Sequence, residues 1–201
     1  MEFVESRTYT TEQMQEEALL RRWQLFGDPP PLGGTGPLCD LCHASTWLEL
    51  GGGDGHDVYH PNFDVRFLPG VDVVYDLGSG IPCHDGHAEK IKTIHLLNHL
   101  SYKKACHLLS ECFRVLRSQG TLFIMVTDLG FLIERISVEG PHMVWMTGVY
   151  GTRGDTYDDD FHYWGYTSQS LQSELERCGF TDIQHCGYYN RWEFKMSATK
   201  P

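Results

Sequence analysis

The chain lacks any apolar run that approaches the roughly 18 residues of a membrane span, and it contains no internal repeat or low-complexity tract. It is also poor in basic residues: 16 Lys and Arg stand against 27 Asp and Glu, which gives a formal net charge of -11. Contacts with phosphates need clustered Lys and Arg, so this balance disfavours nucleic acids and anionic membranes as partners. The acidic N-terminus lacks the apolar core of a signal peptide. We therefore expect a cytoplasmic protein, and its 201 residues suffice for one domain with a full core.

The cysteines are seven in number, and several lie in helical patterns. This usage is typical of reduced thiols in a cytosolic protein. Cys39 and Cys42 form a single C-x-x-C pair that is followed by His43. Zinc sites normally show a second ligand pair at a recognisable spacing. We find none after this pair, so we expect no metal site.

The most informative stretch is TWLELGGGDG, residues 46–55. A short apolar run ends at Leu50 and is followed by Gly51, Gly53 and Gly55. Glycine has no Cβ and tolerates positive φ, so it allows the backbone to approach a ligand closely. The pattern predicts a buried strand that ends in a loop around a nucleotide-like cofactor, at the carboxyl end of the first strand of an open α/β sheet.

The glycine spacing narrows the class of nucleotide. The dinucleotide motif G-x-G-x-x-G needs a third glycine inside the following helix. That place holds His56 if the motif starts at Gly51, and Val58 if it starts at Gly53. A pyrophosphate at a helix N-terminus is therefore poorly supported. The pattern that fits is acid-x-G-x-G-x-G, which begins at Glu49.

Apolar runs and helical patterns alternate along the rest of the chain, which predicts a parallel sheet covered on both faces. Only eight residues separate Gly55 from Asp64, too few for a full crossover helix, so the first helix is expected to be reduced or absent. Strands are expected at 47–50, 63–67, 71–76, 91–100 (with the strand's exit), 121–126, 180–187 and 192–197, and helices at 102–117, 131–136 and after Thr167.

Four segments together resemble the class I S-adenosylmethionine-dependent methyltransferases. The acidic glycine motif resembles the first motif of that family. Residues 71–76 (VDVVYD), with Phe63 to Val65 before them, look like its "VDVV-DL" stretch and the preceding acidic position. Residues 95–100 (HLLNHL) look like "H-V-L-E-H-L", with Asn98 in place of Glu, and residues 112–124 look like "RVL-KPGG-L-I". The resemblance covers roughly residues 46 to 128.

This resemblance implies an α/β, Rossmann-like fold over residues 46–201. The sheet is expected to be seven-stranded and mostly parallel, with one antiparallel strand from a C-terminal hairpin and helices on both faces. The implied cofactor is S-adenosyl-L-methionine. Its methionine end would meet the glycine loop, its ribose Asp64 and its adenine Asp76. The cofactor-binding residues would be Glu49, Gly51, Gly53, Gly55, Asp64, Asp76, Leu77, His95 and Leu96.

Residues 1–45 are expected to form a separate N-terminal part. Residues 10–27 predict a helix that Thr10 caps, with Leu19, Trp23 and Phe26 on one face. A Pro- and Gly-rich linker follows it. The helix either packs on the domain or serves as a lid over the cofactor cleft.

Residues 138–166 are expected to be an irregular insertion that covers the substrate cleft. Tyr163, Trp164 and Tyr166 would provide aromatic walls, and His142 would lie on the substrate side. His162 is the candidate general base because histidine titrates near neutrality, with His142 and His95 in reserve. The alternative is an aromatic cluster that pins the loop to the core.

The expected activity is methyl transfer to an O or N atom of a small molecule, where positioning and desolvation supply much of the acceleration. One alternative is a non-catalytic methyltransferase-like subunit that binds a protein partner; a protein substrate is a further option. Another is an aminopropyltransferase, because residues 51–55 (GGGDG) also resemble the loop of spermidine synthase. The N-terminal β domain of that family is not evident in this chain.

Overall fold

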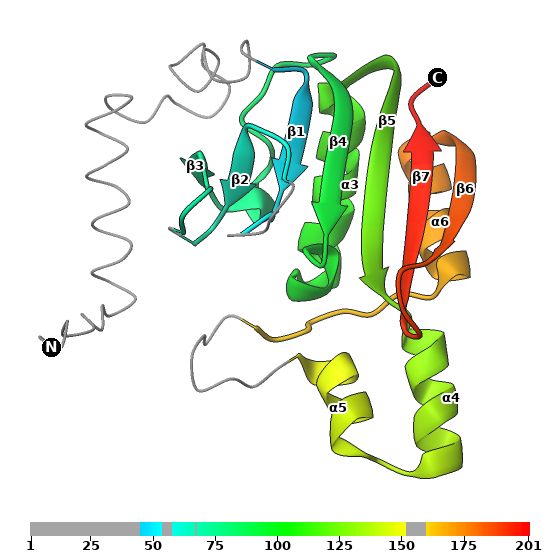
Figure 1. The fold of residues 1–201 in the computed structure, drawn as a ribbon. Coiled ribbons are helices and arrows are strands. Elements are labelled where there is room, and N and C mark those ends of the chain that lie inside the picture. Colours follow the sequence, from blue (N-terminus) through cyan, green and yellow to red (C-terminus); the bar gives the residue numbers. More distant parts are fainter. Residues whose placement is uncertain (1–44, 54–57, 67, 152–159) are drawn as a thin grey trace, which may run out of the picture.

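Seven strands form one sheet in the order β3-β2-β1-β4-β5-β7-β6. The computed structural model describes residues 45–53, 58–66, 68–151 and 160–201 (Figure 1). The strands are β1 (Trp47–Leu50), β2 (Asn62–Asp64), β3 (Val73–Val74), β4 (Ala88–Ile94), β5 (Leu116–Thr127), β6 (Thr181–Tyr188) and β7 (Glu193–Thr199). The helices are α3 (Tyr102–Val115), α4 (Leu129–Glu139), α5 (Met143–Tyr150) and α6 (Ser168–Cys178), with short 3-10 turns η1 (Leu77–Ser79) and η2 (Leu97–His99).

The strand directions confirm the predicted fold class. Strands β1 to β5 pair in parallel. Strand β7 runs antiparallel to both of its neighbours, β5 and β6. The strand order reverses between β1 and β4, which is the point where open α/β sheets bind their ligands.

The connections on the β3 side of the sheet contain little regular structure. Residues 51–61 join β1 to β2, residues 65–72 join β2 to β3, and no helix forms in the described part of either connection. This agrees with the expectation that the chain is too short there for a crossover helix. In the described residues, the carboxyl ends of β1 and β2 are therefore followed directly by loops.

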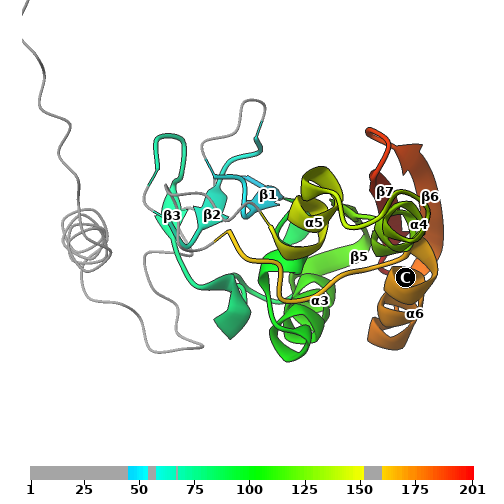
Figure 2. The ribbon, with the colours of Figure 1, turned by 90° about the horizontal axis from the view of Figure 1, so that it is seen from below.

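Helices α3 and α6 pack against the same face of the sheet (Figures 1 and 2). The stripe of α3 that faces the sheet is fully apolar, as its spacing predicts. Its buried members are Ala105, Leu108, Leu109, Cys112 and Val115. They form one core with strand residues such as Leu48, Ile91 and Leu122.

The other face of the sheet carries longer and more polar side chains. Trp47 and Phe123 remain 40% and 37% exposed there. The Lys90 Nζ lies 3.9 Å above the Trp47 ring, a cation–π contact across the β1–β4 pair. The predicted helix at 10–27, with the rest of the expected N-terminal part up to residue 44, lies outside the described residues.

The region predicted to be irregular contains a second helix, which corrects the expectation for residues 138–166. Asp128 caps the N-terminus of helix α4, because its carboxylate accepts from the Gly130 and Phe131 N–H groups, and Gly140, with φ 82°, is the C-cap. Helix α5 follows at once. A Cβ on Gly148 would lie 2.9 Å from the Leu132 methyl groups, so this glycine allows α5 to approach α4. The Gly and Pro residues that suggested a loop mark the ends and the close contact of two helices.

Among the described residues four cysteines are free thiols, as the sequence suggested, namely Cys106, Cys112, Cys178 and Cys186. Burial raises the pKa of the Cys112 thiol. Cys83 departs from the expectation of reduced thiols, because it is disulfide-bonded. None of the helices in the described ranges is both long and apolar enough to span a membrane.

Candidate active site

A cavity of about 670 Å³ opens at the carboxyl edge of the sheet. Each of the first four strands brings a residue to this cavity, either from its end or from the one or two positions that follow it. These residues are Gly51 after β1, Asp64 at the end of β2, Asp76 after β3 and His95 after β4. Leu77 and Leu96 line it as well. Six of the residues predicted to bind the cofactor therefore surround one cavity, and its volume is that of a small-molecule site.

The backbone conformation and the lack of space both require a glycine at position 51. Its φ is 73°, its N–H donates to the Phe63 carbonyl at 2.7 Å, and an added Cβ would lie 2.9 Å from the Leu96 Cβ. Gly53 also has positive φ, at 56°, and its N–H donates to the Asp64 Oδ2 at 3.0 Å. Gly53 thus holds the loop against Asp64. Gly55 lies outside the described residues.

Asp64 is buried at the edge of the cavity with both carboxylate oxygens bonded within the chain. The Arg66 backbone N–H donates to Oδ1 at 2.8 Å, and the Arg66 guanidinium donates to Oδ1 at 3.1 Å and to Oδ2 at 3.3 Å. The carboxylate predicted to meet a ribose is therefore compensated by a neighbouring cation.

Asp76 is also paired with a cation of the chain, but it is more exposed to solvent than Asp64. Its Oδ1 accepts from the Gly78 N–H at 2.9 Å and caps η1, and its Oδ2 pairs with the Lys104 Nζ at 3.2 Å. Partial burial opposes ionisation, but the hydrogen bonds from Lys104 and Gly78 and the Lys104 charge hold the pKa of Asp76 below its ordinary value. The side chain remains 49% exposed, so it is accessible to a ligand.

Glu49 does not line the cavity. It is 1% exposed, its Oε2 accepts from the Tyr59 N–H at 3.1 Å, and the Lys92 Nζ lies 3.0 Å from the same oxygen. Its position in the strand places it on the same face as Trp47, opposite α3. Glu49 therefore ties the strand to the segment that follows the glycine loop.

His95 is the most unusual residue of the site. Its φ is 57°, in the left-handed region that a non-glycine residue rarely adopts, and such strain is concentrated at functional positions. Its Nε2 lies 3.4 Å from the Glu193 Oε1, at the start of β7. Burial lowers the pKa of His95, Glu193 opposes this, and the nearby His162 lowers it further.

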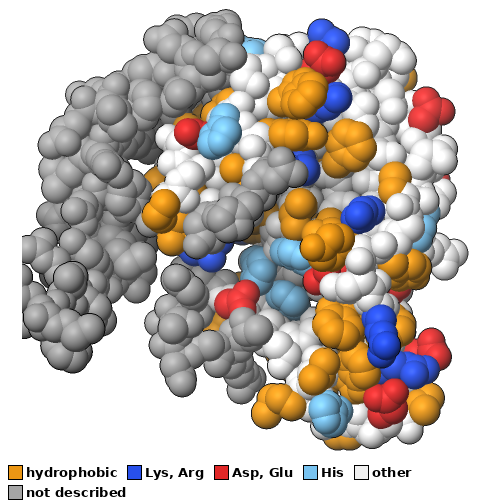
Figure 3. All heavy atoms as spheres, viewed as in Figure 1, with side chains coloured by type: hydrophobic (Ala, Val, Ile, Leu, Met, Phe, Trp, Pro, Cys, Tyr) orange, Lys and Arg blue, Asp and Glu red, His pale blue; other side chains and the backbone are white. Residues whose placement is uncertain are grey.

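Two more histidines complete a cluster at this edge, where histidine side chains gather in the space-filling view (Figure 3). The rings of His99 and His162 are 4.9 Å apart, and the His99 Nε2 lies 3.7 Å from the Asp160 Oδ1. Burial is the main cause that lowers the pKa of His99 and of His162. His99 and Asp160 line the cavity. His162 does not; its Nδ1 lies 2.9 Å from the Gly148 carbonyl.

Sequence reasoning missed His99 and Asp160. His99 follows His95 at a spacing of four, which was a readable signal. Asp160 belongs to an acidic run at 158–160 and could not be placed without the fold.

The predicted substrate residues separate into two groups. Tyr163 lines the cavity and is 65% exposed. Trp164 packs on the Tyr102 ring at 4.7 Å, Tyr166 is buried in the core, and His142 caps α5. The last three therefore hold the structure around the site.

Asn98 anchors this segment. Its backbone carbonyl accepts from the Tyr163 N–H at 2.8 Å, and its side-chain amide donates to the Trp164 carbonyl at 3.3 Å. Asn98, which stands in place of the Glu of the family pattern, thus joins η2 to the segment after α5. Within the described ranges, no three His, Cys, Asp or Glu side chains are grouped as a metal site.

The fold is that of the class I S-adenosylmethionine-dependent methyltransferases. One similar structure is a SAM-dependent methyltransferase from Thermotoga maritima, with a TM-score of 0.52, 13% identity, and coverage of 77% of this chain and 82% of that chain. Another is a SAM-dependent methyltransferase from Methanosarcina mazei, with a TM-score of 0.53, 14% identity, and coverage of 77% and 91%. A third comes from a complex of the Haloferax volcanii Trm112 methyltransferase activator with a methyltransferase, with a TM-score of 0.51, 11% identity, and coverage of 94% and 89%.

No protein-family model matches the chain, and no curated protein sequence matches it. At these identities the likeness is one of fold.

Proposed function

We propose that this chain is a methyltransferase that binds S-adenosylmethionine in the cavity at the carboxyl edge of β1 to β4 and methylates an O or N atom of a small molecule. The observation that carries the proposal is the convergence of Gly51, Asp64, Asp76 and His95 on one cavity. Four separate strands deliver these residues, so their meeting is a property of the fold and not of one local motif.

The residues of the cavity fit this cofactor. Gly51 leaves room where a Cβ would meet Leu96, and two carboxylates face the same space. Asp64 would accept hydrogen bonds from the ribose hydroxyls, and Asp76 one from the adenine amino group, with Leu77 and Leu96 as apolar walls. The Arg66 side chain, which is 35% exposed, would have to share Asp64 or turn toward solvent.

The bound cofactor supplies an electrophilic methyl group on a sulfonium. The chain positions the acceptor, excludes water and takes up a proton where the acceptor carries one. His95 and His99 line the cavity, and burial favours their neutral, proton-accepting forms. They are therefore better placed as the base than His162, whose ring packs against His99 and whose role we propose to be the support of that ring.

The cavity favours a small acceptor. Asp160 and Tyr163, from the segment after α5, are among the residues that line it. A carboxylate and an exposed aromatic ring suit a cationic or aromatic molecule through charge, cation–π and stacking contacts. Residues 1–45, which precede the domain, are proposed to pack on it or to cover this cleft.

Isothermal titration with S-adenosylmethionine and S-adenosylhomocysteine tests the proposal. We expect micromolar binding, about -8 kcal/mol, to the wild-type chain and a loss in Asp64→Ala. Glu134→Ala, at a surface site on α4 away from the cavity, is the matched control and should bind normally. No heat with either ligand in a chain with an intact circular dichroism spectrum would refute the proposal.

A non-catalytic subunit that binds a protein partner is the second candidate. The observation that favours it is the internal pairing of all three predicted carboxylates: Glu49 with Lys92, Asp64 with Arg66, and Asp76 with Lys104. These acids therefore have a structural reason to be present without a cofactor. The titration separates the two functions, because a subunit of this kind can be fully folded and still give no heat.

A further inference from the structure

His95 and Glu193 meet at the end of β5, although they are far apart in the sequence. His95 follows β4, and its N–H donates to the Met125 carbonyl of β5 at 2.9 Å. Glu193 is the first residue of β7 and pairs with Thr127, the last residue of β5. Because β7 runs antiparallel to β5, its first residue lies at the carboxyl edge of the parallel strands (Figure 1). The topology therefore places a carboxylate beside the histidine that follows β4.

Glu193 is held in place from its other side. The Asn190 side-chain amide donates to the Glu193 Oε2 at 2.6 Å, and the other oxygen, Oε1, lies 3.4 Å from the His95 Nε2. The Glu193 side chain is 14% exposed, so solvent screens its charge only weakly. Glu193 is not among the residues that line the cavity. It can therefore act on a ligand in the cavity only through His95.

The carboxylate defines the tautomer of a neutral His95 ring. A carboxylate only accepts hydrogen bonds, so the ring nitrogen that faces it, Nε2, carries the proton and Nδ1 carries the basic lone pair. Within the described ranges, the His95 Nδ1 has no polar partner, and His95 lines the cavity. The separation of 3.4 Å is longer than a full hydrogen bond, as is common for a catalytic pair before its substrate binds.

The other two histidines of the cluster lack this combination. The His99 Nδ1 lies 3.0 Å from a backbone carbonyl and so carries the proton, and the remaining His99 nitrogen lies 3.7 Å from the Asp160 carboxylate. His162 does not line the cavity, and its Nδ1 lies 2.9 Å from the Gly148 carbonyl. Of the three, His95 alone lines the cavity with a ring nitrogen that no other group of the described chain engages.

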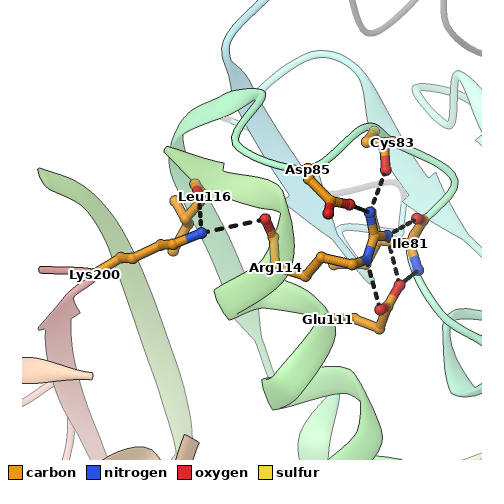
Figure 4. A network of polar contacts seen from close by, with 7 residues as sticks. All are labelled: Ile81, Cys83, Asp85, Glu111, Arg114, Leu116 and Lys200. Atoms are coloured by element: carbon orange, nitrogen blue, oxygen red, sulfur yellow. Dashed lines mark hydrogen bonds and ion pairs between the residues drawn. The ribbon is translucent and has the colours of Figure 1, made fainter. Parts of the chain in front are cut away.

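A structural polar network of the same chain looks different (Figure 4). The Arg114 guanidinium donates all five of its N–H groups, at 2.7 to 2.8 Å, to partners in the loop before β4 and on α3, namely Ile81, Cys83, Asp85 and Glu111. Every donor of that side chain is used, so the network can only hold the loop. The pair of His95 and Glu193 is fixed on one side and open on the other, which is the arrangement of a base and the group that orients it.

From this geometry we propose that His95 is the proton acceptor of the candidate active site and that Glu193 is the positioning residue that fixes its tautomer. The inference rests on the proposed methyl transfer. As the acceptor atom bonds to the methyl carbon, the electron pair of the carbon–sulfur bond remains on the sulfur, and the proton of the acceptor passes to the His95 Nδ1. The Glu193 carboxylate then stabilises the imidazolium through its Nε2–H group.

The test is nuclear magnetic resonance of the full chain with ¹⁵N-labelled histidine, because the ring nitrogen signals report which nitrogen carries the proton. The chain has eleven histidines, and the signals that are missing in His95→Asn identify His95. Asparagine suits this position because it tolerates the left-handed backbone conformation better than most residues. In the wild type at neutral pH we expect the Nε2–H tautomer of His95.

Glu193→Gln keeps the shape of the side chain and removes its charge. It should decrease the ratio of the Nε2–H to the Nδ1–H tautomer by about threefold or more, because a charge-assisted contact is lost. It should also lower the pKa of His95 further, because the Glu193 charge opposes the effect of burial. The other charged or titratable groups that act on His95 remain in this variant: His99 from η2, and Asp160 and His162 from the segment after α5.

Glu176→Gln is the matched control, because the Glu176 carboxylate accepts from Gln172 on the surface of α6, and it should leave the tautomer and the pKa of His95 unchanged. An Nδ1–H tautomer of His95 in the wild type would overturn the proposal, and so would the same tautomer ratio in Glu193→Gln as in the wild type. The wild-type signal requires no variant, so it remains decisive if Glu193→Gln fails to fold.

Addition of S-adenosylhomocysteine separates this inference from the proposed function. We expect heat in isothermal titration and a shift of the His95 ring nitrogen signals on saturation. Heat without a change at His95 would overturn the role of His95 and leave the cofactor in place. No heat in a folded chain would refute the proposed function and, with it, the role of His95 in methyl transfer, whatever tautomer the ring adopts.

Discussion

Asp64 and Arg66 form an ion pair at the edge of the cavity, with 3.1 Å between the Arg66 Nε and the Asp64 Oδ1. The carboxylate is 5% exposed and the guanidinium 35%, so the acid is fixed while the cation can move toward solvent. The pair compensates a buried charge at the point where the proposed cofactor would place its ribose. Binding of the proposed cofactor would therefore compete with an interaction inside the chain.

Replacement of Arg66 by Gln should tighten binding of S-adenosylmethionine. The ribose hydroxyls would no longer compete with a charged donor, and a charge-assisted hydrogen bond contributes about 1.5–3 kcal/mol. Because Arg66 is partly exposed and solvent screens its charge, we expect Kd to decrease by only about threefold to tenfold, as measured by isothermal titration. Arg135→Gln on α4, whose ion pairs with Glu134 and Glu139 are remote from the cavity, is the matched control. Weaker binding in Arg66→Gln would show that Arg66 itself contacts the ligand.

The buried pair of Glu49 and Lys92 should matter for stability. Lys92→Met leaves the Glu49 carboxylate, 1% exposed, without its cation, and breaking a buried pair costs about 3–5 kcal/mol. The double variant Glu49→Gln/Lys92→Met removes both charges and should recover part of that loss. Urea unfolding of the wild type, both single variants and the double variant gives the coupling energy. Additive effects would show that the two side chains do not stabilise each other.

The strand pattern and much of the site could be predicted from sequence because they depend on local signals. The apolar runs at 71–76 and 121–126 and the glycines after Leu50 fix where strands end, and parallel strands bring their ends to one edge. This is why Asp64, Asp76 and His95 were found together.

The sequence could not show which of the candidate side chains point into the cavity and which pack elsewhere in the fold. Glu49 fits the family motif, yet its strand position directs it to Lys92 and away from the cavity. Tyr166 was predicted to line the substrate cleft, but an isolated parallel β-bridge with Asp128 places it in the core. Helix α5 was missed because Gly148 reads as a breaker, whereas its lack of a side chain serves the contact with Leu132. Each of these depends on contacts between residues distant in sequence.

The close approach at Gly51 can be separated from its backbone strain by a matched pair of variants. Gly51 and Gly70 both have positive φ, 73° and 88°, but only at Gly51 would a Cβ meet another residue, Leu96 at 2.9 Å. Gly70→Ala should cost about 1–2 kcal/mol from strain alone. Gly51→Ala should cost about 1–3 kcal/mol more from overpacking, and it should weaken cofactor binding because Leu96 lines the cavity. If Gly51→Ala and Gly70→Ala lost the same unfolding free energy in urea, the close approach between residue 51 and Leu96 would be contradicted.

The histidine cluster should make the folded chain sensitive to mild acid. Burial lowers the pKa of His95, His99 and His162 below the ordinary value of 6.5. In the interval between the lowered pKa and 6.5 the unfolded chain binds more protons than the folded chain, so stability falls as the pH decreases through that interval. Above it the three groups are neutral in both states and contribute no pH dependence.

Urea unfolding at about pH 7.5, 6.5 and 5.5 measures this slope. The His162→Gln variant should lose less unfolding free energy on acidification, because the nearby His99 and His95 then experience less repulsion when they are protonated. His107→Gln, at an exposed position on α3 outside the cluster, should leave the slope unchanged. A wild-type chain whose unfolding free energy is the same at the three pH values, or a His162→Gln variant with an unaltered slope, would show that the cluster is not buried as a neutral unit. The same buried, neutral state is what would allow His95 or His99 to accept a proton near neutral pH, so this equilibrium measurement also bears on the proposed chemistry before any acceptor is known.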